Sequence, residues 1–413
     1  MKRIRYILLA MVFITGSCST PSQVETEPSF SATSDIISNL IFPTPSALPP
    51  TSIPTPTVEI VQQQEPTLVT KYVFPYDYLT INDVYFIDEN NGWAIGNLEW
   101  YEQTVSSIAC CQPKLFNTTD GGGNWIEVET GIASGLLNSI VWTDAKTGYI
   151  VGQESFFENS KALILRTIDG GKHWKRVGGN QQKGRLNFVV ATQNNGLWGV
   201  GEDYSNSLDS RQSLILRSMD GLNWKTQIHP SQIGAELTAI AFPSEKVGYA
   251  IGFIGHDSPD PYIIKTLDGG DNWVELPTPF TTGRLLDMVF LNDVTGYIVG
   301  HHGDTSLIAI TNDGAENWTI DMLQSGVWLH WFTESKNRFV ILGNCADTDY
   351  CNNLIGLFNG KELFPFETVT FPDGNFTAVG NSMSDGNITF VVNTKPETWD
   401  AKYQTTFFRY NVP

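Results

Sequence analysis

The chain from about residue 79 onward alternates short apolar runs with polar, turn-forming segments. Each repeat opens with an apolar run that ends in a large side chain, and six positions later a glycine precedes an aromatic residue. An apolar run, a tight turn and a second apolar run are typical of a β-hairpin. The clearest pairs are Phe86 with Gly92-Trp93, Trp142 with Gly148-Tyr149, Phe242 with Gly248-Tyr249, and Phe290 with Gly296-Tyr297, and looser versions contain Val190, Phe332 and Val379.

A second motif, Ser/Thr-x-Asp-x-Gly-x-x-Trp, closes most repeats. An aspartate can accept backbone N–H bonds inside a tight turn, and glycine supplies the positive φ that a Cβ disfavours. The tryptophan is expected to fold back and fill the space between strands, so we assign these residues a structural role and no catalytic one. The third copy is one residue shorter, and the fifth has Ala315 where glycine is expected. The pairs are Asp120 and Trp125, Asp169 and Trp174, Asp220 and Trp224, Asp268 and Trp273, and Asp313 and Trp318.

The spacing of the repeats predicts an all-β fold. Two hairpins in a unit of about 48 residues make one four-stranded antiparallel sheet, and radial repetition of such sheets is a β-propeller. Hairpins open near residues 81, 137, 186, 237, 285, 327 and 376, which predicts seven blades over residues 71–413. Residues 71–75 precede the first repeat and could pair into the last blade, which would close the ring and remove an exposed sheet edge.

These motifs together resemble bacterial neuraminidase (Asp-box) repeats. Within that superfamily the chain looks most similar to the photosystem II stability and assembly factor propellers. The resemblance implies a non-enzymatic, seven-bladed, protein-binding scaffold outside the cytoplasm, without a cofactor. It also implies an arginine patch on one face, for which this sequence offers Arg185 and Arg284.

The N-terminus is expected to direct export. Lys2, Arg3 and Arg5 precede a short apolar run, and small residues lead to Cys18, which resembles a bacterial lipoprotein signal peptide over residues 1–18 with a lipidated Cys18. An ordinary signal peptide cleaved nearby is the alternative. Residues 19–70 are rich in Ser, Thr and Pro, and proline blocks both helices and sheets, so this segment is expected to be a disordered tether. The expected location is the cell membrane or the outer cell surface, through a lipid anchor.

The charge restricts the possible partners. The formal net charge is −19, and an acidic surface repels phosphate backbones, so nucleic acid is excluded as a partner. A monomer that binds a basic protein surface, or a surface glycan, fits this composition.

The loops between the second and third strands of each blade are the predicted binding rim. They lie on the face opposite the Asp-box turns, and they carry aromatic residues beside carboxylates, which suits sugar stacking or a basic protein patch. A solvated acidic rim without a ligand is the alternative. The rim residues singled out are Trp100, Tyr101, Glu154, Tyr204, Asp257, Tyr262, Asp349 and Trp399.

Enzymatic activity is not expected. Sialidases share the Asp-box propeller, but they need converging arginines to bind the substrate carboxylate, and their Arg-Ile-Pro signature is absent. The remaining enzymatic alternative is a glycoside hydrolase that uses two rim carboxylates.

The cysteines and histidines do not form a metal motif. Cys345 and Cys351 bracket a short loop and are the expected disulfide of an exported chain, whereas the pairing of Cys110 and Cys111 stays open. The adjacent histidines His301 and His302 are expected to point apart on an extended chain, so no metal site is assigned.

Overall fold

The computed structural model describes residues 67–98, 112–155, 160–178, 182–192, 196–205, 212–227, 235–255, 259–303 and 305–325, and further strands between residues 327 and 411. The chain divides into two compact units, Met1–Val61 and Gln62–Pro413. All described residues lie in the second unit, so the expected signal peptide, Cys18 and most of the tether lie outside them. No helix in this part of the chain is long and apolar enough to cross a membrane.

The described strands form seven four-stranded sheets, numbered here in chain order. Sheet one contains β2 (Leu79–Phe86), β3 (Gly92–Leu98), β4 (Gln112–Thr118) and β5 (Ile126–Glu127). Sheet two contains β6 (Leu136–Trp142), β7 (Gly148–Gln153), β8 (Ala162–Thr167) and β9 (Lys175–Arg176). Sheet three contains β10 (Gly184–Ala191), β11 (Leu197–Asp203), β12 (Gln212–Ser218) and β13 (Lys225–Thr226). Sheet four contains β14 (Ala235–Ala241), β15 (Gly248–Ile254), β16 (Asp260–Thr266) and β17 (Val274–Glu275).

The remaining sheets follow the same order. Sheet five contains β18 (Arg284–Phe290), β19 (Gly296–His302), β20 (Thr305–Thr311) and β21 (Thr319–Ser325). Sheet six contains β22 (Val327–Ser335), β23 (Arg338–Cys345), β24 (Asn353–Phe358) and β25 (Leu363–Val369). Sheet seven contains β26 (Asn375–Ser382), β27 (Asn387–Lys395), β28 (Gln404–Asn411) and, from the other end of the chain, β1 (Thr67–Val73).

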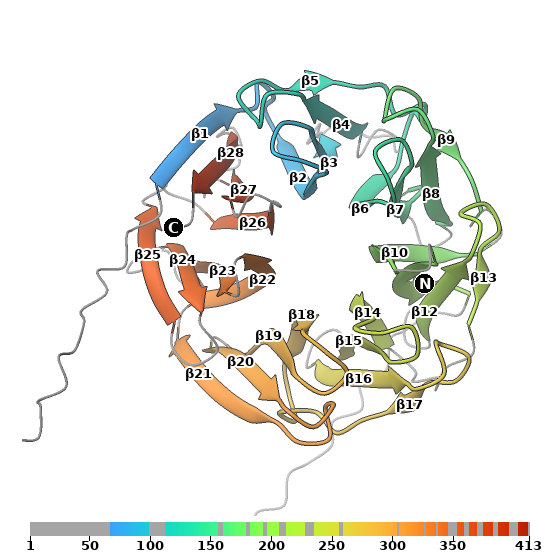
Figure 1. Cartoon of the computed structure of the whole chain (residues 1–413), viewed down its shortest axis with the longest axis vertical. Coiled ribbons are helices and arrows are strands. Elements are labelled where there is room, and N and C mark those ends of the chain that lie inside the picture. The colour runs from blue at the N-terminus through green and yellow to red at the C-terminus, as the bar shows by residue number, and fades with distance from the viewer. Residues whose placement is uncertain are drawn as a thin grey trace, which may run out of the picture. The chain divides into compact units, whose positions relative to one another are not determined.

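The sheets stand around a common centre. The first strand of each sheet lies innermost, and the last strand lies at the periphery (Figure 1). The inner strands contact one another in a closed cycle, from β2 through β6, β10, β14, β18, β22 and β26 back to β2. Every neighbouring pair of strands within the sheets is antiparallel. An all-β propeller of four-stranded antiparallel blades is therefore confirmed.

The ring is closed by strands from both ends of the described chain. β1 pairs with β28, from Thr67 opposite Asn411 to Val73 opposite Thr406. The closing strand therefore begins a few residues before the expected start of the propeller at residue 71. Asn393 of sheet seven then bonds to sheet one, because its side chain accepts from the Ile81 amide at 2.9 Å and donates to the Ile81 carbonyl at 2.8 Å.

A bulge in the inner strand explains the second glycine of the repeat. The pairing of β6 with β7 shifts register between Leu137 and Ser139. A Cβ on Gly152, which faces Leu137, would stand only 1.8 Å from the Leu136 carbonyl oxygen. A side chain cannot be accommodated so close to backbone, so this position requires glycine. The same close approach occurs at Gly96, Gly201, Gly252 and Gly300.

In sheets one to four, the residue in the bulge links its sheet to the next. Asn82 donates to the Leu137 carbonyl at 2.7 Å, and the side chain of Asn138 does the same to Leu186 at 2.8 Å. Asn187 and Thr238 make the corresponding bonds to sheets four and five. These bonds satisfy carbonyls that the bulge would otherwise leave without a partner. The sequence pattern alone does not reveal this role of the asparagines.

Aromatic rings pack across the boundaries between sheets. Trp93 of sheet one lies 4.1 Å from Trp142 of sheet two, centroid to centroid, and Trp198 of sheet three lies 4.6 Å from Phe242 of sheet four. The Trp198 ring also covers Gly270, where an added Cβ would stand 2.0 Å from it. The aromatic residue of one repeat and the Asp-box glycine of the next are thus complementary parts of one contact.

The Asp-box tryptophans are not equally buried. Trp125, Trp174 and Trp273 are buried, as expected, and belong to the hydrophobic clusters between sheets. Trp224 and Trp318 also pack against such clusters but are only partly buried. They follow the two turns that depart from the motif, the short turn of sheet three and the turn with Ala315, which takes a positive φ of 70°.

We expect the tryptophans to differ in their contribution to stability accordingly. Trp174→Ala should lower the free energy of unfolding by about 3–5 kcal/mol, because it empties a closely packed site. Trp224→Ala should cost less, about 1–3 kcal/mol, since part of that ring already contacts water. Denaturant unfolding of the two variants measures both values. Equal losses would contradict the difference in burial.

A half-buried carboxyl group lies on the inner strand of sheet one. One carboxylate oxygen of Asp83 accepts from the Ile140 amide of sheet two at 2.9 Å, and the other accepts from the Val84 amide at 2.8 Å. Burial raises the pKa of Asp83 from 3.8 to about 7, against the lowering effect of these hydrogen bonds. Compared with the unfolded chain, the folded state therefore favours the protonated form of Asp83.

This raised pKa predicts a loss of stability near neutral pH. The folded state binds the proton more tightly than the unfolded chain, so the stabilisation is complete below pH 3.8 and is lost as the pH rises through about 7. We expect the free energy of unfolding to fall by about 2–4 kcal/mol over this window.

Asp83→Asn should remove most of that dependence. The exposed Asp88→Asn is the matched control, because the pKa of Asp88 is lowered and that group no longer titrates above pH 5. Chemical unfolding at a series of pH values gives both slopes. If the stability of Asp83→Asn fell with rising pH as much as that of the wild type, Asp83 would not be the group responsible.

Candidate binding faces

The Asp-box turns form one end of the sheets, and their carboxylates are occupied by local hydrogen bonds. The Asp120 Oδ1 atom accepts from the Asn124 amide at 2.9 Å and from the Thr118 hydroxyl at the same distance. The Thr118 hydroxyl oxygen accepts from the Gly122 amide at 2.9 Å. The same pattern recurs around Asp169, Asp268 and Asp313, and in a tighter form around Asp220.

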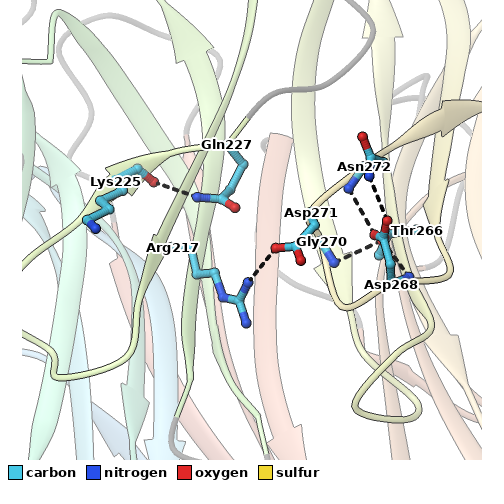
Figure 2. A network of polar contacts seen from close by, with 8 residues as sticks. All are labelled: Arg217, Lys225, Gln227, Thr266, Asp268, Gly270, Asp271 and Asn272. Atoms are coloured by element: carbon cyan, nitrogen blue, oxygen red, sulfur yellow. Dashed lines mark hydrogen bonds and ion pairs between the residues drawn. The ribbon is translucent and has the colours of Figure 1, made fainter.

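These bonds keep the aspartates ionised. The side-chain amide of Asn272, followed by its backbone amide, lowers the pKa of Asp268 to about 2. The backbone and side-chain amides of Asn317 have the same effect on Asp313. A carboxylate held this way anchors a turn and is poorly suited to general acid or base work near neutral pH. Figure 2 shows the turn around Asp268 beside an ion pair that joins sheets three and four, Arg217 with Asp271 at 3.3 Å.

A small pocket opens between sheets three and four at this same end. Its floor contains the stacked rings of Trp198 and Phe242, and the Arg217 guanidinium lies 4.8 Å above the Trp198 ring. Met219 lies at its side, and the cavity volume is about 70 Å³. This pocket could not be predicted from the sequence, because its walls come from two repeats and its aromatic residues are the same ones that form the repeat motif.

The opposite end carries the predicted rim. Many of the loops that form it lie outside the described residues, and with them Trp100, Tyr101, Asp257, Asp349 and Trp399. Cys351 also lies outside, and only the backbone of Cys345 is described, at the end of β23, so the expected disulfide stays a prediction.

Arg185 lies at the base of the rim and joins two sheets. Its Nη2 atom lies 2.6 Å from Glu236 of sheet four, and its Nε atom lies 3.6 Å from Glu202 of sheet three. Both glutamates are buried, Glu202 almost completely, and Asn187 donates to Glu236 at 3.1 Å. Although burial acts against the charged form, the pKa of Arg185 is raised by Glu236, Tyr204 and Glu202. The arginine expected in a binding patch is thus held in an inter-sheet network.

Other predicted rim residues are also bonded within the propeller. The Tyr204 hydroxyl donates to the Gln153 side chain of sheet two at 3.2 Å, and Glu154 pairs with Arg176. The Arg284 guanidinium lies 4.4 Å above the ring of Phe253. These contacts place Tyr204 at the boundary of sheets two and three and Arg185 at the boundary of sheets three and four, whereas Glu154 is paired within sheet two.

The prediction that Tyr262 is a surface contact is wrong. β16 begins at Asp260, so Tyr262 lies inside the strand, opposite Gly252. Its side chain is 1% exposed and belongs to the cluster between sheets three and four. Burial raises its pKa. The sequence placed this residue in a loop because the start of a strand cannot be located from an apolar run that begins with Asp-Pro.

The described residues contain no group of three or more His, Cys, Asp or Glu side chains that could hold a metal ion. The Nδ1 atom of His302 faces the Thr282 hydroxyl at 2.8 Å, and His301 Nδ1 lies 3.2 Å from the Gly303 carbonyl oxygen.

Comparison with known proteins supports the fold and not an activity. No family model and no curated protein matches the sequence. A puromycin-hydrolysing peptidase of Mycobacterium tuberculosis is similar with a TM-score of 0.51 and 10% identity, over 78% of this chain and 52% of that one. YCF48 from Cyanidioschyzon merolae is 14% identical over 67% of this chain and 96% of its own, with a TM-score of 0.37. An α-L-arabinofuranosidase of Fusarium graminearum is 11% identical over 83% and 97%, with a TM-score of 0.44. Because identity is low, the similarity concerns the fold alone.

We expect the Arg185 network to be structural. Arg185→Met should lower the free energy of unfolding by about 3 kcal/mol, because it leaves buried carboxylates without their counter-charge. Adding Glu236→Met should recover part of that loss, since the pair is then replaced by apolar side chains. A double-mutant cycle in urea measures the coupling. Losses that simply add would show that the ion pair contributes nothing.

Proposed function

We propose that this chain is a non-enzymatic, exported scaffold that binds a protein partner, with each of the seven sheets serving as one blade. A lipid on Cys18 would hold it at the membrane, and residues 19–66 would act as the tether. The contact surface is the rim of loops between the second and third strands.

The observation that carries this proposal is the bonding at the roots of the rim loops. Arg185 ties sheet three to sheet four, and Tyr204 ties sheet three to sheet two through Gln153. The strands from which these loops emerge are therefore fixed relative to one another. Loops that vary in sequence on a rigid base are a common arrangement for binding.

The state of the carboxylates favours binding over catalysis. A glycoside hydrolase needs a carboxylic acid and a carboxylate that face one substrate. In the described part of the chain, the Asp-box aspartates are held by turn amides, Glu154 is paired with Arg176, and Glu202 and Glu236 are paired with Arg185. These groups stabilise the scaffold, which leaves the aromatic residues of the rim as the candidate contacts.

The charge supports a basic partner. A net charge of −19 attracts positively charged surfaces and raises association rates at low salt. A neutral glycan would instead be bound by stacking on aromatic rings and by hydrogen bonds, with little dependence on salt.

The rim aromatics provide the test. The combined change Trp100→Ala, Tyr101→Ala and Trp399→Ala should weaken binding by about 1–3 kcal/mol for each contacting ring, and the melting temperature should stay nearly constant. Photo-crosslinking from position 101 in the full-length chain identifies the partner, and titration of that partner at increasing salt gives the affinity.

Two results would count against the proposal. Unchanged affinity in the triple variant would place the contact elsewhere. Salt-independent binding of the wild type to neutral glycans on an array, lost in the triple variant, would identify the rim as a sugar-binding surface.

A further inference from the structure

The Asp-box face, opposite the proposed rim, carries exposed aliphatic side chains at equivalent places. Ile168 in sheet two, Met219 in sheet three and Leu267 in sheet four each precede the Asp-box aspartate. They are 63%, 57% and 63% exposed. Since the turns of neighbouring sheets lie at the same end of the propeller, these residues form an arc across three consecutive sheets, which we call the apolar arc.

The turn itself does not require an apolar residue at this position. Thr119 in sheet one and Asn312 in sheet five occupy the same place in turns with the same hydrogen bonds. Exposed Ile, Met and Leu side chains therefore contribute little to the turn, and grouped exposed apolar side chains often mark an interaction surface.

Neighbouring turns extend the apolar arc. Leu222 lies in the Asp-box turn of sheet three, and Leu291 and Val294 lie in the turn between β18 and β19, at the same end of sheet five. Each of the three is 47% exposed. The pocket over Trp198 and Phe242 opens within the arc, and Met219 forms part of its wall. The pocket lining combines these apolar side chains with the Arg217 guanidinium and Glu245, so it can receive the apolar part of one partner side chain.

The charges around the apolar arc are mostly negative. In sheets two to five, the turns at this end contain nine carboxylates and three lysines, and two of the carboxylates have a local partner, Asp271 with Arg217 and Asp169 with His173. The carboxylates are Asp144, Asp169, Asp220, Glu245, Asp268, Asp271, Asp293, Asp313 and Glu316, and the lysines are Lys146, Lys172 and Lys246. The turn amides that lower the pKa of Asp268 and Asp313 keep those carboxylates charged at neutral pH. A partner that complements this surface must itself be apolar and basic.

We infer that the apolar arc is a second docking surface, which binds a basic amphipathic segment of a protein. The partner's apolar side chains cover Ile168, Met219 and Leu267, and one of them enters the pocket over Trp198. Its Lys and Arg side chains lie against the surrounding carboxylates. Together with the rim, this surface would let one propeller hold two partners on opposite faces.

A model peptide tests the inference directly. The probe is a fluorescent synthetic peptide of leucine and lysine with amphipathic helical spacing, titrated into the full-length chain by anisotropy. The combined change Ile168→Ser, Met219→Ser and Leu267→Ser should weaken binding about tenfold or more. Glu245→Gln with Glu316→Gln should weaken it at low salt and reduce its salt dependence. A peptide of the same composition in scrambled order should bind more weakly than the amphipathic one.

The matched control removes equally exposed side chains elsewhere. Ile126 and Val274 are 70% and 54% exposed on the peripheral strands β5 and β17, and Ile126→Ser with Val274→Ser should leave the affinity unchanged. All variants should melt like the wild type, because the replaced side chains are exposed.

Three outcomes would overturn the inference. The first is equal affinity of the apolar-arc variant and the control variant for the peptide. The second is wild-type binding to zwitterionic lipid vesicles that the apolar-arc variant loses, which would make the surface a membrane contact. The third is a wild-type dimer in sedimentation that the apolar-arc variant converts to a monomer, which would assign the surface to a second copy of the chain.

Discussion

The structure depends on the contact between an aromatic ring of one sheet and the Asp-box turn of the next. Trp93 packs against Trp142 with its ring tilted, and its indole also lies against Gly171, where an added Cβ would stand 2.5 Å from the ring nitrogen. Phe407 makes the equivalent approach to Gly122 across the closure of the ring. A four-stranded sheet of this length has two apolar faces and cannot bury either alone. The ring–glycine contact sets how closely neighbouring sheets approach, and so it determines whether the set of sheets closes.

Closure in turn makes the two ends of the sheets chemically different. At one end, every described Asp-box turn uses its aspartate and its hydroxyl residue to satisfy its own backbone, so variation is concentrated at outward-pointing positions such as the one before the aspartate. At the other end, the loops are free to differ, and bonds such as those from Arg185 and Tyr204 hold only their roots. Binding residues are therefore expected at positions where the fold does not require a particular side chain. Those places are the rim loops and the outward-pointing positions of the Asp-box turns.

Parts of the fold could be predicted from local pattern because they depend on local physics. A Gly-aromatic pair six residues after a large apolar residue predicts a hairpin, and a Thr-x-Asp-x-Gly turn predicts its own hydrogen bonds. Contacts between repeats could not be predicted in the same way. Asn82, Asn138 and Asn187 look like ordinary polar residues in a strand, and only the bulge in the folded strand turns their amides toward the next sheet. Tyr262 was misplaced for a similar reason, since its burial depends on the register of β16 against β15 and not on its polar neighbours.

The sequence by itself determined the periodic strands, the turn chemistry and the acidic character of the surface, because each of these is set by residues within a few positions of one another. The tertiary structure decided which side chains meet across sheets. It placed Arg185 between two buried glutamates, raised the pKa of Asp83 by burial against sheet two, and gathered Ile168, Met219 and Leu267 on one face from repeats about fifty residues apart. Each of these contacts depends on how far apart the repeats lie in space. That distance is fixed only when the ring of sheets closes and each aromatic ring packs against the glycine of the next turn.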